Sequence, residues 1–426
     1  MVRTRNIFWL GIIFSFGMHE CSRCSEPLVY GKEVQEYSPV VAGQEHQLEQ
    51  ACARKRKALL AFAPKVSLEA TLQKRSAICL YPRHHLGLAV EQVLFDPAKT
   101  IFPYRKEKLL VQSQLGAYDV TLHETNNDAL EYDITFASEK KNELSTLLLQ
   151  SYAHMQYGYD EALYKSGLAI EPPVLLSKAR TAESDTAYAN TFLKQTAALV
   201  GFQSTIGDSA IQPFGYEREA RGEGLDTFLH TYTPKKIVNK AVSNNPLMRQ
   251  LWFSMQAALE DASAASWSYV PRAYLFFGCD SQRYDPICQS LAESLPLANW
   301  QGGIRIEWDF DGLGRIEDRS IAFSEYCKIA SDRQVAIKDF EKAATTYHTT
   351  LTNLSASIAD TKATLAAQTA SYQERHAQYQ AGLVIAVDVE KVRADMAQTQ
   401  QKLDELLKQA ALNYEAITLL SGYSLA

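Results

Sequence analysis

The sequence predicts a mainly α-helical protein made of two tandem repeats, each a helix, two strands and a long helical hairpin. Three observations predict this fold class: a phrase that occurs twice, segments in which apolar and polar residues alternate, and long stretches with apolar residues at heptad spacing. Glycine and proline are sparse, at 20 and 14 of 426 residues, which also favours long helices.

The duplicated phrase relates the two halves of the chain. Residues 164–174 read YKSGLAIEPPV, and residues 379–389, which lie 215 positions later, read YQAGLVIAVDV. With the same shift, VLFD at residues 93–96 falls on WDFD at residues 308–311. Two phrases in the same order and at the same spacing predict a tandem duplication rather than a chance match.

Further upstream the shift between the halves is smaller. Pro39 pairs with Pro246, and Pro64 pairs with Pro271, both 207 positions apart. The second copy therefore holds eight extra residues between Pro271 and the WDFD phrase. We predict that one loop is enlarged there.

Each repeat is predicted to begin with a helix that is followed by strands. In the second copy the helix covers residues 246–266 and is opened by Asn244-Asn245-Pro246, a cap with proline in the first turn, and its counterpart covers residues 40–63. Strands follow in KVSLEATL and GIRIEWDF, where every second residue is apolar. One apolar and one polar face suit a half-buried sheet and a membrane barrel equally well, so the alternation leaves both open.

The C-terminal part of each repeat is predicted to be a pair of long antiparallel helices. In the second copy apolar residues recur at steps of four and three, the heptad pattern of coiled-coil packing. They are Phe340, Ala344, Tyr347, Leu351, Leu354, Ile358, Thr361, Leu365 and Tyr372 before the phrase, and Val392, Met396, Thr399, Leu403, Leu406, Ala410 and Ile417 after it. A helix of about 65 residues before the phrase would be about 100 Å long.

The duplicated phrase is then the turn between the two helices of each pair. Gly167 and Gly382 are expected to end the incoming helices, because glycine adopts a left-handed conformation at little cost. Asp388 lies near the start of the outgoing helix, where its charge suits the helix dipole. In the first copy Pro172 and Pro173 take this place, and proline is tolerated in a first turn.

The N-terminus has the features of an export signal. A basic start precedes an apolar run from Ile7 to Gly17, which is too short to span a bilayer as a helix. Residues 1–24 are interpreted as a secretory signal peptide, with a short buried helix as the alternative. Cys21 or Cys24 would be the site of lipidation in a further alternative, but the residues before them are a poor lipidation signal.

These features divide the chain into four parts. They are a signal peptide at residues 1–24, a first repeat at 25–202, a linker at 203–232 and a second repeat at 233–426. Elsewhere the sequence has no run of about 20 apolar residues that would predict a membrane helix. Contact with a membrane would therefore use strands or the N-terminus.

Catalytic, metal and nucleic-acid sites find little support in the sequence. The formal charge of −6 does not predict a nucleic-acid-binding surface. Phosphate-loop and nucleophile-elbow motifs are absent from the sequence. No enzymatic activity, metal or cofactor is expected; a metal site at Cys79, His84 and His85 is the alternative considered. Cys279 and Cys288 lie in a predicted loop, where an exported protein could oxidise them to a disulfide, and two free thiols are the alternative.

The two phrases, their order, the heptads and the signal peptide resemble those of the outer-membrane efflux protein (TolC-like) family, over about residues 39–422. The resemblance implies a homotrimer whose four strands per subunit form a shared 12-stranded β-barrel in outer-membrane lipid, with the long helices continuing across the periplasm as an α-barrel. It also implies a passive exit duct of a tripartite efflux or type I secretion system, for small molecules or secreted protein, working with a periplasmic adaptor protein and an inner-membrane pump. The alternative from another class is an exported coiled-coil scaffold without a pore.

The resemblance also implies roles for residues at the hairpin tips. The Gly-Leu turns, Gly167 with Leu168 and Gly382 with Leu383, would dock the adaptor. The residues expected to line the pore or its periplasmic gate are Tyr164, Tyr379, Asp388 and Lys391.

Two positions depart from the pattern of the best-known members of that family. Val384 stands where those members have an arginine that helps to latch the closed entrance, and Lys391 stands where they have a second aspartate. These departures put a salt-bridged latch and strong cation selectivity in doubt.

Overall fold

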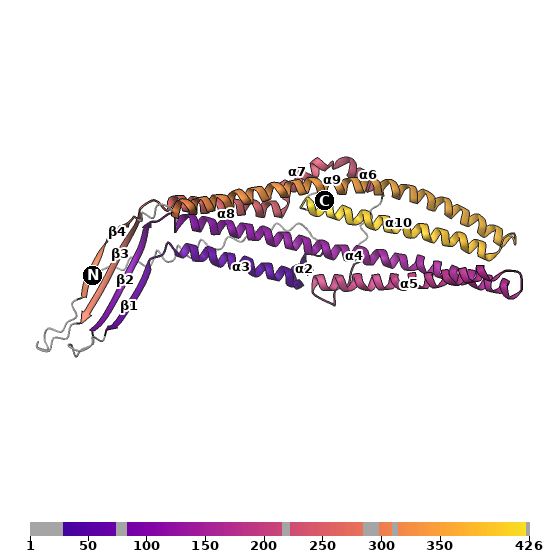
Figure 1. Ribbon diagram of the computed structural model, residues 1–426, viewed down its shortest axis with the longest axis horizontal. Helices are drawn as coiled ribbons and strands as arrows, with labels where there is room; N and C mark the ends of the chain where they lie inside the picture. The colour runs from indigo at the N-terminus through magenta and orange to yellow at the C-terminus, as the bar shows by residue number, and fades with distance from the viewer. Residues whose placement is uncertain (1–28, 74–82, 215–221, 284–297, 309–313, 423–426) are drawn as a thin grey trace, which may run out of the picture.

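The protein is a long curved rod with a sheet at one end and the turns of two helical hairpins at the other (Figure 1). The predicted signal peptide, with Cys21 and Cys24, lies outside the residues that this computed structural model describes. Those residues are 29–73, 83–214, 222–283, 298–308 and 314–422.

The same order of elements occurs twice along the chain, as predicted. The first repeat contains α3 (Pro39–Leu60), β1 (Lys65–Gln73), β2 (Arg83–Phe95), α4 (Ile101–Lys165) and α5 (Glu171–Ile206). The second repeat contains α8 (Pro246–Trp267), β3 (Arg272–Arg283), β4 (Ala298–Glu307), α9 (Gly314–Gln380) and α10 (Ala386–Leu420). The short helix α2 (Gly31–Tyr37) precedes the first repeat, and α6 (Gly222–Thr231) and α7 (Pro234–Asn244) lie between the two.

The long helices have the predicted length and the predicted register. α4 has 65 residues and α9 has 67, so each is about 100 Å long. The ends of these helices, Lys165 and Gln380, are 215 positions apart, and so are the first residues of α5 and α10, Glu171 and Ala386. The helix α5 continues past the boundary drawn at residue 202 and ends at Ile206.

Within the described ranges, four strands form one antiparallel sheet in the order β1-β2-β3-β4. Its central pair, β2 with β3, joins the two repeats, and an irregularity between Val93 and Phe95 interrupts this pairing near the helices. Among the described residues, β1 and β4 each keep one edge unpaired. β4 ends at Glu307, and the last three residues of the WDFD phrase lie outside the described part of the chain.

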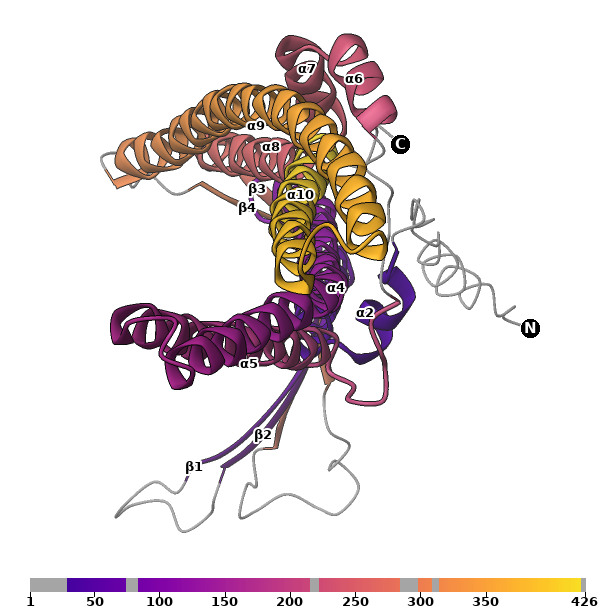
Figure 2. The same cartoon turned by 90° about the vertical axis from the view of Figure 1, so that its right-hand side faces the viewer.

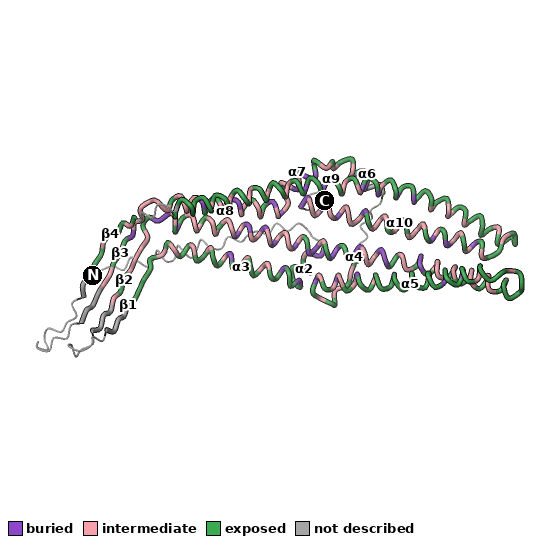
Figure 3. Tube along the Cα trace, viewed as in Figure 1, coloured by how far each residue is buried: buried purple, intermediate pink, exposed green. Residues whose placement is uncertain are grey.

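The helices form a single curved layer, seen along the rod in Figure 2. Toward the tips the neighbouring helices follow the order α5-α4-α10-α9, and toward the sheet they follow the order α3-α4-α8-α9. The short helices α6 and α7 pack against α9. Exposed residues concentrate at both tips and on the outer strands (Figure 3). None of the described helices combines the length and the hydropathy needed to cross a membrane.

The heptad residues predicted for the second hairpin form its core. Ala344, Leu351, Leu354 and Ile358 of α9 pack with Leu403, Ala410 and Ile417 of α10, and all are at most 8% exposed. Burial of such side chains contributes about 1.5–3 kcal/mol each relative to exposure. The spacing therefore identified the residues that hold α9 and α10 together.

Tyr30 attaches the start of the described chain to the first hairpin. The amide of Tyr30 donates to Oδ1 of Asn126 at 2.9 Å, and its hydroxyl donates to Oδ2 of Asp133 at 2.5 Å. Its ring packs edge-on against Phe202 and stacks on Phe214. Tyr30 and Asp133 are both fully buried, and burial together with the Asp133 carboxylate raises the pKa of Tyr30.

Candidate functional site: the outer face of the sheet and the hairpin tips

One face of the sheet is apolar and exposed. Directly opposite residues of an antiparallel sheet share a face, and the register places Val90 opposite both Val66 and Phe277. The large apolar side chains on this face expose between 42% and 71% of their surface; they are Val66, Leu68, Leu88, Leu275, Phe277, Ile304 and Ile306. An apolar surface that continues across four strands is typical of contact with lipid or with a partner.

The other face of the sheet carries polar and charged side chains. Ser67, Glu91, Arg305 and Glu307 lie there, one residue out of step with the apolar set. Arg305 lies 3.8 Å from the carboxylate of Glu307 and over the ring of Phe276. The division into an apolar and a polar face that the sequence predicted for KVSLEATL and GIRIEWDF is therefore present in β1 and β4, whereas on β3 the second face also carries Tyr274 and Phe276.

Asp96, the last residue of the VLFD phrase, ties the sheet to α4. Its Oδ1 accepts the amide of Lys99 at 3.1 Å, and its backbone carbonyl accepts the hydroxyl of Thr100 at 2.6 Å. Its Oδ2 accepts the hydroxyl of Tyr274 at 3.1 Å and lies 3.9 Å from Nε of Arg272. The repeated phrase marked this junction in the sequence, but nothing in its spacing identified the two partners on β3.

The first hairpin tip is formed by its backbone. Gly167 has a φ of +74°, in the left-handed region. Its amide donates to the carbonyl of Tyr164 at 2.9 Å, and the amide of Leu168 donates to the carbonyl of Leu163 at 2.9 Å. This pair of bonds is the Schellman motif, in which the residue after the helix cap is left-handed. The requirement for glycine is conformational, because a Cβ at Gly167 would meet no atom within 4 Å.

The second tip repeats this geometry. Gly382 has a φ of +73°, and its amide donates to the carbonyl of Tyr379 at 2.9 Å. The amide of Leu383 donates to the carbonyl of Gln378, also at 2.9 Å. The expectation that Gly167 and Gly382 end the incoming helices is therefore confirmed.

Large apolar side chains project from both tips. Leu168 is 78% exposed and Leu383 is 76% exposed, and Ile170 beside the first tip is 70% exposed. Tyr164 and Tyr379 are each 45% exposed. An exposed leucine at the end of a rigid turn is suited to insertion into a partner. The docking role of these residues stays a prediction.

Asp388 and Lys391 lie on the first two turns of α10. Asp388 is in the first turn, and its amide donates to the carbonyl of the capping residue, Ile385, at 3.2 Å. Its position at the positive end of the helix dipole is therefore as expected. Both side chains are exposed in this chain, and their role in lining a pore stays a prediction.

The two hairpins interact near their tips, which the sequence did not indicate. Tyr152 lies on α4, and burial raises its pKa. The carboxylates of Asp395 and Asp388 on α10 raise that pKa further. A side chain of the first repeat is thus within electrostatic reach of the candidate gate residues of the second.

The remaining predicted site residues are placed as follows. Cys279 lies on β3, whereas Cys288 lies outside the described residues, so their disulfide stays a prediction. His84 and His85 lie on β2, and Cys79 lies outside the described residues. Within the described ranges, no group of three or more His, Cys, Asp or Glu residues could hold a metal ion.

Comparison with known proteins gives one family and several solved structures. The family model described as "Outer membrane efflux protein" matches residues 237–423, which cover most of the second repeat. No curated protein matches the chain.

Solved structures match nearly the whole chain. CusC, whose structures concern folding and transmembrane channel formation, is 15% identical with a TM-score of 0.73, over 92% of this chain and 91% of its own. VceC from Vibrio cholerae is 14% identical with a TM-score of 0.73, over 92% and 95%. The CmeC outer membrane channel of Campylobacter jejuni is 12% identical with a TM-score of 0.73, over 92% and 85%. At these identities the likeness shows a shared fold.

Proposed function

We propose that this chain belongs to the outer membrane efflux protein family, whose model matches residues 237–423, and that three copies of it form the exit duct of a tripartite export system. As is typical of that family, it is a channel of the outer membrane that extends into the periplasm and is a passive conduit rather than an enzyme. The cargo is a small molecule or a secreted protein, handed over by an inner-membrane pump through a periplasmic adaptor.

The observation that carries this proposal is the apolar outer face of the sheet. A sheet in water would bury such a face, yet Leu68, Ile304 and Ile306 each expose 65% or more of their surface. Lipid accepts this face without cost, while the polar face is suited to a water-filled lumen. A coiled-coil scaffold without a pore offers no reason for strands of this kind.

The unpaired edges of the sheet support assembly of several copies. Hydrocarbon does not tolerate unpaired backbone groups, so a membrane sheet must close. Barrels need about eight strands or more, and one copy supplies four. Pairing β4 of one copy with β1 of the next around a three-fold axis gives a closed barrel of twelve strands, which is our proposal.

The edges of the helical layer support the same arrangement. The outer helices α5 and α9 are the ones with a free side toward the tips. Both carry exposed apolar residues, toward the tip on α5 and toward the sheet on α9; they are Leu175, Leu176, Phe192, Leu193 and Val200 on α5, and Ile316, Ile321, Phe323 and Val335 on α9. Toward the sheet the outer helices are α3 and α9. We infer that α9 of one copy packs against α5 of the next near the tips and against its α3 near the sheet, which continues the barrel as a helical tube.

The tips are the proposed contacts with the adaptor. Their two Gly-Leu turns present Leu168 and Leu383 on backbones of the same shape. Behind the second tip, Asp388 and Lys391 are the proposed charged lining of the entrance. With Val384 in place of arginine, the closed entrance would depend on the packing of α10 against α4 rather than on a salt-bridged latch.

The test of this function is single-channel conductance of detergent-purified protein in planar bilayers. We expect discrete conducting steps from the unmodified protein, and steps with altered ion selectivity from Asp388→Ala. Unchanged steps would retain the pore and restrict Asp388 to its position at the helix start. A water-soluble, correctly folded oligomer that never inserts would favour the scaffold instead.

Substitutions on the two sheet faces separate a lipid-facing surface from a general loss of folding. Leu68→Arg places a charge on the apolar face, at a cost of about 2–4 kcal/mol near the bilayer midplane. Ser67→Arg is its matched control on the polar face of the same strand. We expect only Leu68→Arg to abolish insertion; equal loss from both would contradict a lipid-facing surface.

A further inference from the structure

Lysines and arginines are concentrated where the helices of the first repeat meet the sheet. They lie on the last turns of α3, in the connection before α4 and on the first turns of α4; they are Arg54, Lys55, Arg56, Lys57, Lys99, Arg105, Lys106 and Lys108. Two of them have acidic partners. Nε of Arg54 lies 3.9 Å from the carboxylate of Glu107, and Nζ of Lys106 lies 2.9 Å from that of Asp261.

Three of these cations lie on the convex face of the helical layer. The helix α2 covers this face farther along the rod (Figure 2), and Val41 of α3 and Asn126 of α4 contact the segment that leads into α2. Lys55 follows Val41 by two heptads, and Arg105 precedes Asn126 by three. Residues separated by whole heptads share a face of packed helices. Lys108 lies one turn after Arg105 and shares its face.

Apolar side chains lie between these cations and the sheet. On α3, Lys55 is followed one turn later by Leu59 and then by Phe62, and on α4, Ile101 precedes Arg105 by one turn. Leu59, Phe62 and Ile101 each expose 38–39% of their surface. Apolar side chains toward the sheet and cations one turn away are the order expected at the boundary of a bilayer.

Two tryptophans lie at the same level of the rod. Trp308 directly follows β4 and is 56% exposed, and its indole Nε1 donates to the carbonyl of Tyr269 at 3.1 Å. Trp267 is the last residue of α8, is 43% exposed and packs against the ring of Phe102. Tryptophan is enriched where membrane proteins pass from lipid to water. With the sheet in lipid, the cations would therefore lie at the level of the headgroups.

The second repeat shows that the fold does not require these cations. The duplication places a neutral residue at each corresponding position: Ala262 for Lys55, Gly314 for Lys99, Ser320 for Arg105 and Phe323 for Lys108. The two repeats nevertheless form the same helices and strands. Lys99 also lies just before the start of α4, where the helix dipole disfavours a cation. The positive charge is therefore not explained by helix stability.

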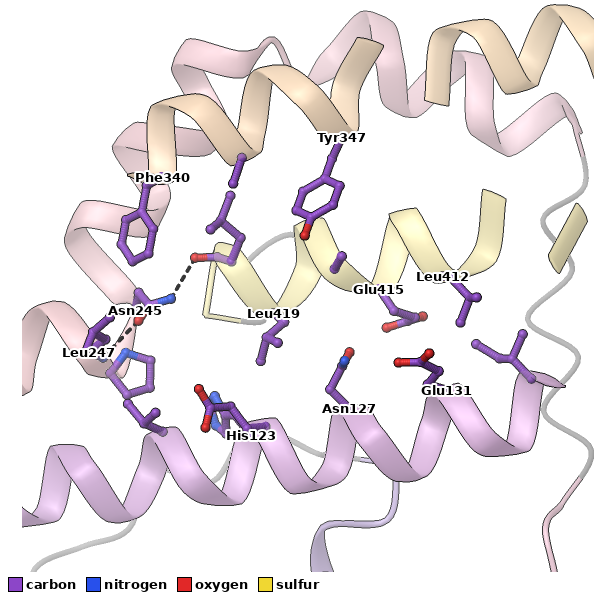
Figure 4. A pocket seen from close by; sticks show the side chains of 17 residues that line it. His123, Asn127, Glu131, Asn245, Leu247, Phe340, Tyr347, Leu412, Glu415 and Leu419 are labelled. Atoms are coloured by element: carbon purple, nitrogen blue, oxygen red, sulfur yellow. Dashed lines mark hydrogen bonds between the residues drawn. The ribbon is translucent and has the colours of Figure 1, made fainter. Parts of the chain in front are cut away.

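Farther along α4 the charge has the opposite sign. A pocket between α4 and α10 is lined by Glu124, Glu131 and Glu415, and Figure 4 shows Glu131 and Glu415 turned toward each other. An anion would thus be attracted to the sheet end of α4 rather than to this part of the wall.

We propose that Lys55, Arg105 and Lys108 bind the phosphate groups of anionic phospholipids, in the leaflet next to the helices. Lys99 is exposed and extends this basic patch toward the sheet. Cations near a bilayer surface attract anionic headgroups, and lysine and arginine form charge-assisted hydrogen bonds with phosphate oxygens. The inference rests on the proposed insertion of the sheet into a membrane. It leaves free the lateral edges through which the copies are proposed to pack, because the patch lies on the convex face.

The test is energy transfer from the tryptophans of the full-length protein to dansyl-labelled phospholipids in phosphatidylcholine vesicles. One set of vesicles contains a trace of dansyl-phosphatidylglycerol, which is anionic, and the other contains the same amount of dansyl-phosphatidylcholine. Trp267 and Trp308 are donors at the level of the basic patch. We expect the anionic lipid to be enriched around the protein at least about threefold, and the enrichment to fall with added salt.

A pair of substitutions identifies the patch. Arg105→Gln with Lys108→Gln should remove most of the enrichment. The matched control, Lys140→Gln with Lys194→Gln, removes the same charge from exposed positions on α4 and α5. Lys140 lies about 50 Å from Arg105 along α4, so the control should keep the enrichment. Equal loss from both pairs, or no lipid preference in the unmodified protein, would overturn the patch.

Two further measurements separate this proposal from its alternatives. Inorganic phosphate and chloride at equal ionic strength should lower the enrichment equally, and stronger displacement by phosphate would identify free phosphate as the ligand instead of lipid. Conductance of each variant in phosphatidylcholine bilayers reports on the duct. Conducting steps without lipid preference would overturn the basic patch and retain the duct. Failure of the unmodified protein to insert would contradict the duct, and the headgroup site with it.

Discussion

The helix α10 packs against two neighbours in two different ways. Toward α9 it presents Leu403, Ala410 and Ile417 to an apolar core. Toward α4 it presents Lys408, whose ammonium lies 3.6 Å from the carboxylate of Glu139, with both side chains at most 15% exposed. The seam within the second hairpin is therefore apolar, whereas the seam between the repeats is polar.

The contact between α9 and α10 and the contact between α4 and α10 should therefore differ in how they respond to solution conditions. Apolar packing is non-directional and nearly independent of salt and pH, so α9 and α10 form one firm hairpin. Ion pairs and buried titratable groups depend on geometry, salt and pH. At Asp404 on α10, for example, burial raises the pKa, while the amide of Gln400 and the charge of Lys141 on α4 lower it. Changes in salt or pH should therefore weaken the contact between the two hairpins while each hairpin stays folded.

The largest expected effect comes from breaking the apolar seam. Leu351 on α9 is fully buried, so Leu351→Ala should lower the free energy of unfolding by about 3–4 kcal/mol through lost contacts and a cavity. Thermal melting of the purified protein, followed by circular dichroism, measures the loss. The control Glu341→Ala, at an exposed position of the same helix, should melt like the unmodified protein. A loss below about 1 kcal/mol would mean that the seam is not a packed core.

A smaller effect is expected from the polar seam. Lys408→Met leaves Glu139 buried without its ammonium partner and should cost about 2–3 kcal/mol. Replacing both residues, Lys408→Met with Glu139→Leu, should restore stability to within about 1 kcal/mol, because neither charge is then left buried alone. Denaturant melts of the two single variants and the double variant measure the coupling. Additive losses would show that the pair does not interact.

The smallest effect concerns pH. The pKa of His123 falls from 6.5 in an open setting to about 4 in the fold. Its contribution to stability is therefore fully present above pH 6.5 and is lost as the pH falls toward 4, because only the unfolded chain takes up the proton in that window. The loss should be about 1–2 kcal/mol. Melting temperatures measured from pH 7 to pH 4 should fall less in His123→Gln than in the unmodified protein, and parallel curves would contradict the assignment.

The sequence predicted one of these seams and not the other. Leu351, Ile358 and Leu403 recur at heptad spacing, so periodicity alone placed them between α9 and α10. Glu139 and Lys408 look like residues of a solvated helix face, and their contact depends on how the two hairpins are placed side by side. No pattern within one helix encodes that placement.

The candidate sites divide in the same way. The alternation of the strands and the glycines of the tips are local, and both were predicted from the sequence. The partners of Asp96 on β3 lie more than 170 positions away along the chain, which spacing in the sequence does not reveal. The alternation of apolar and polar residues predicted the apolar face of the sheet. The contact of this face with lipid was predicted only from the resemblance to the outer-membrane efflux protein family.

The shape of each hairpin tip is independent of its surface chemistry. A glycine with positive φ and two backbone bonds fix the turn in both repeats, although one outgoing helix begins with Pro172 and Pro173 and the other carries Asp388. The side chains there are free to diverge while the backbone they stand on is conserved within the molecule. One subunit therefore presents two turns with the same backbone and different side chains, and in a trimer these two kinds of turn would alternate around the end of the helical tube.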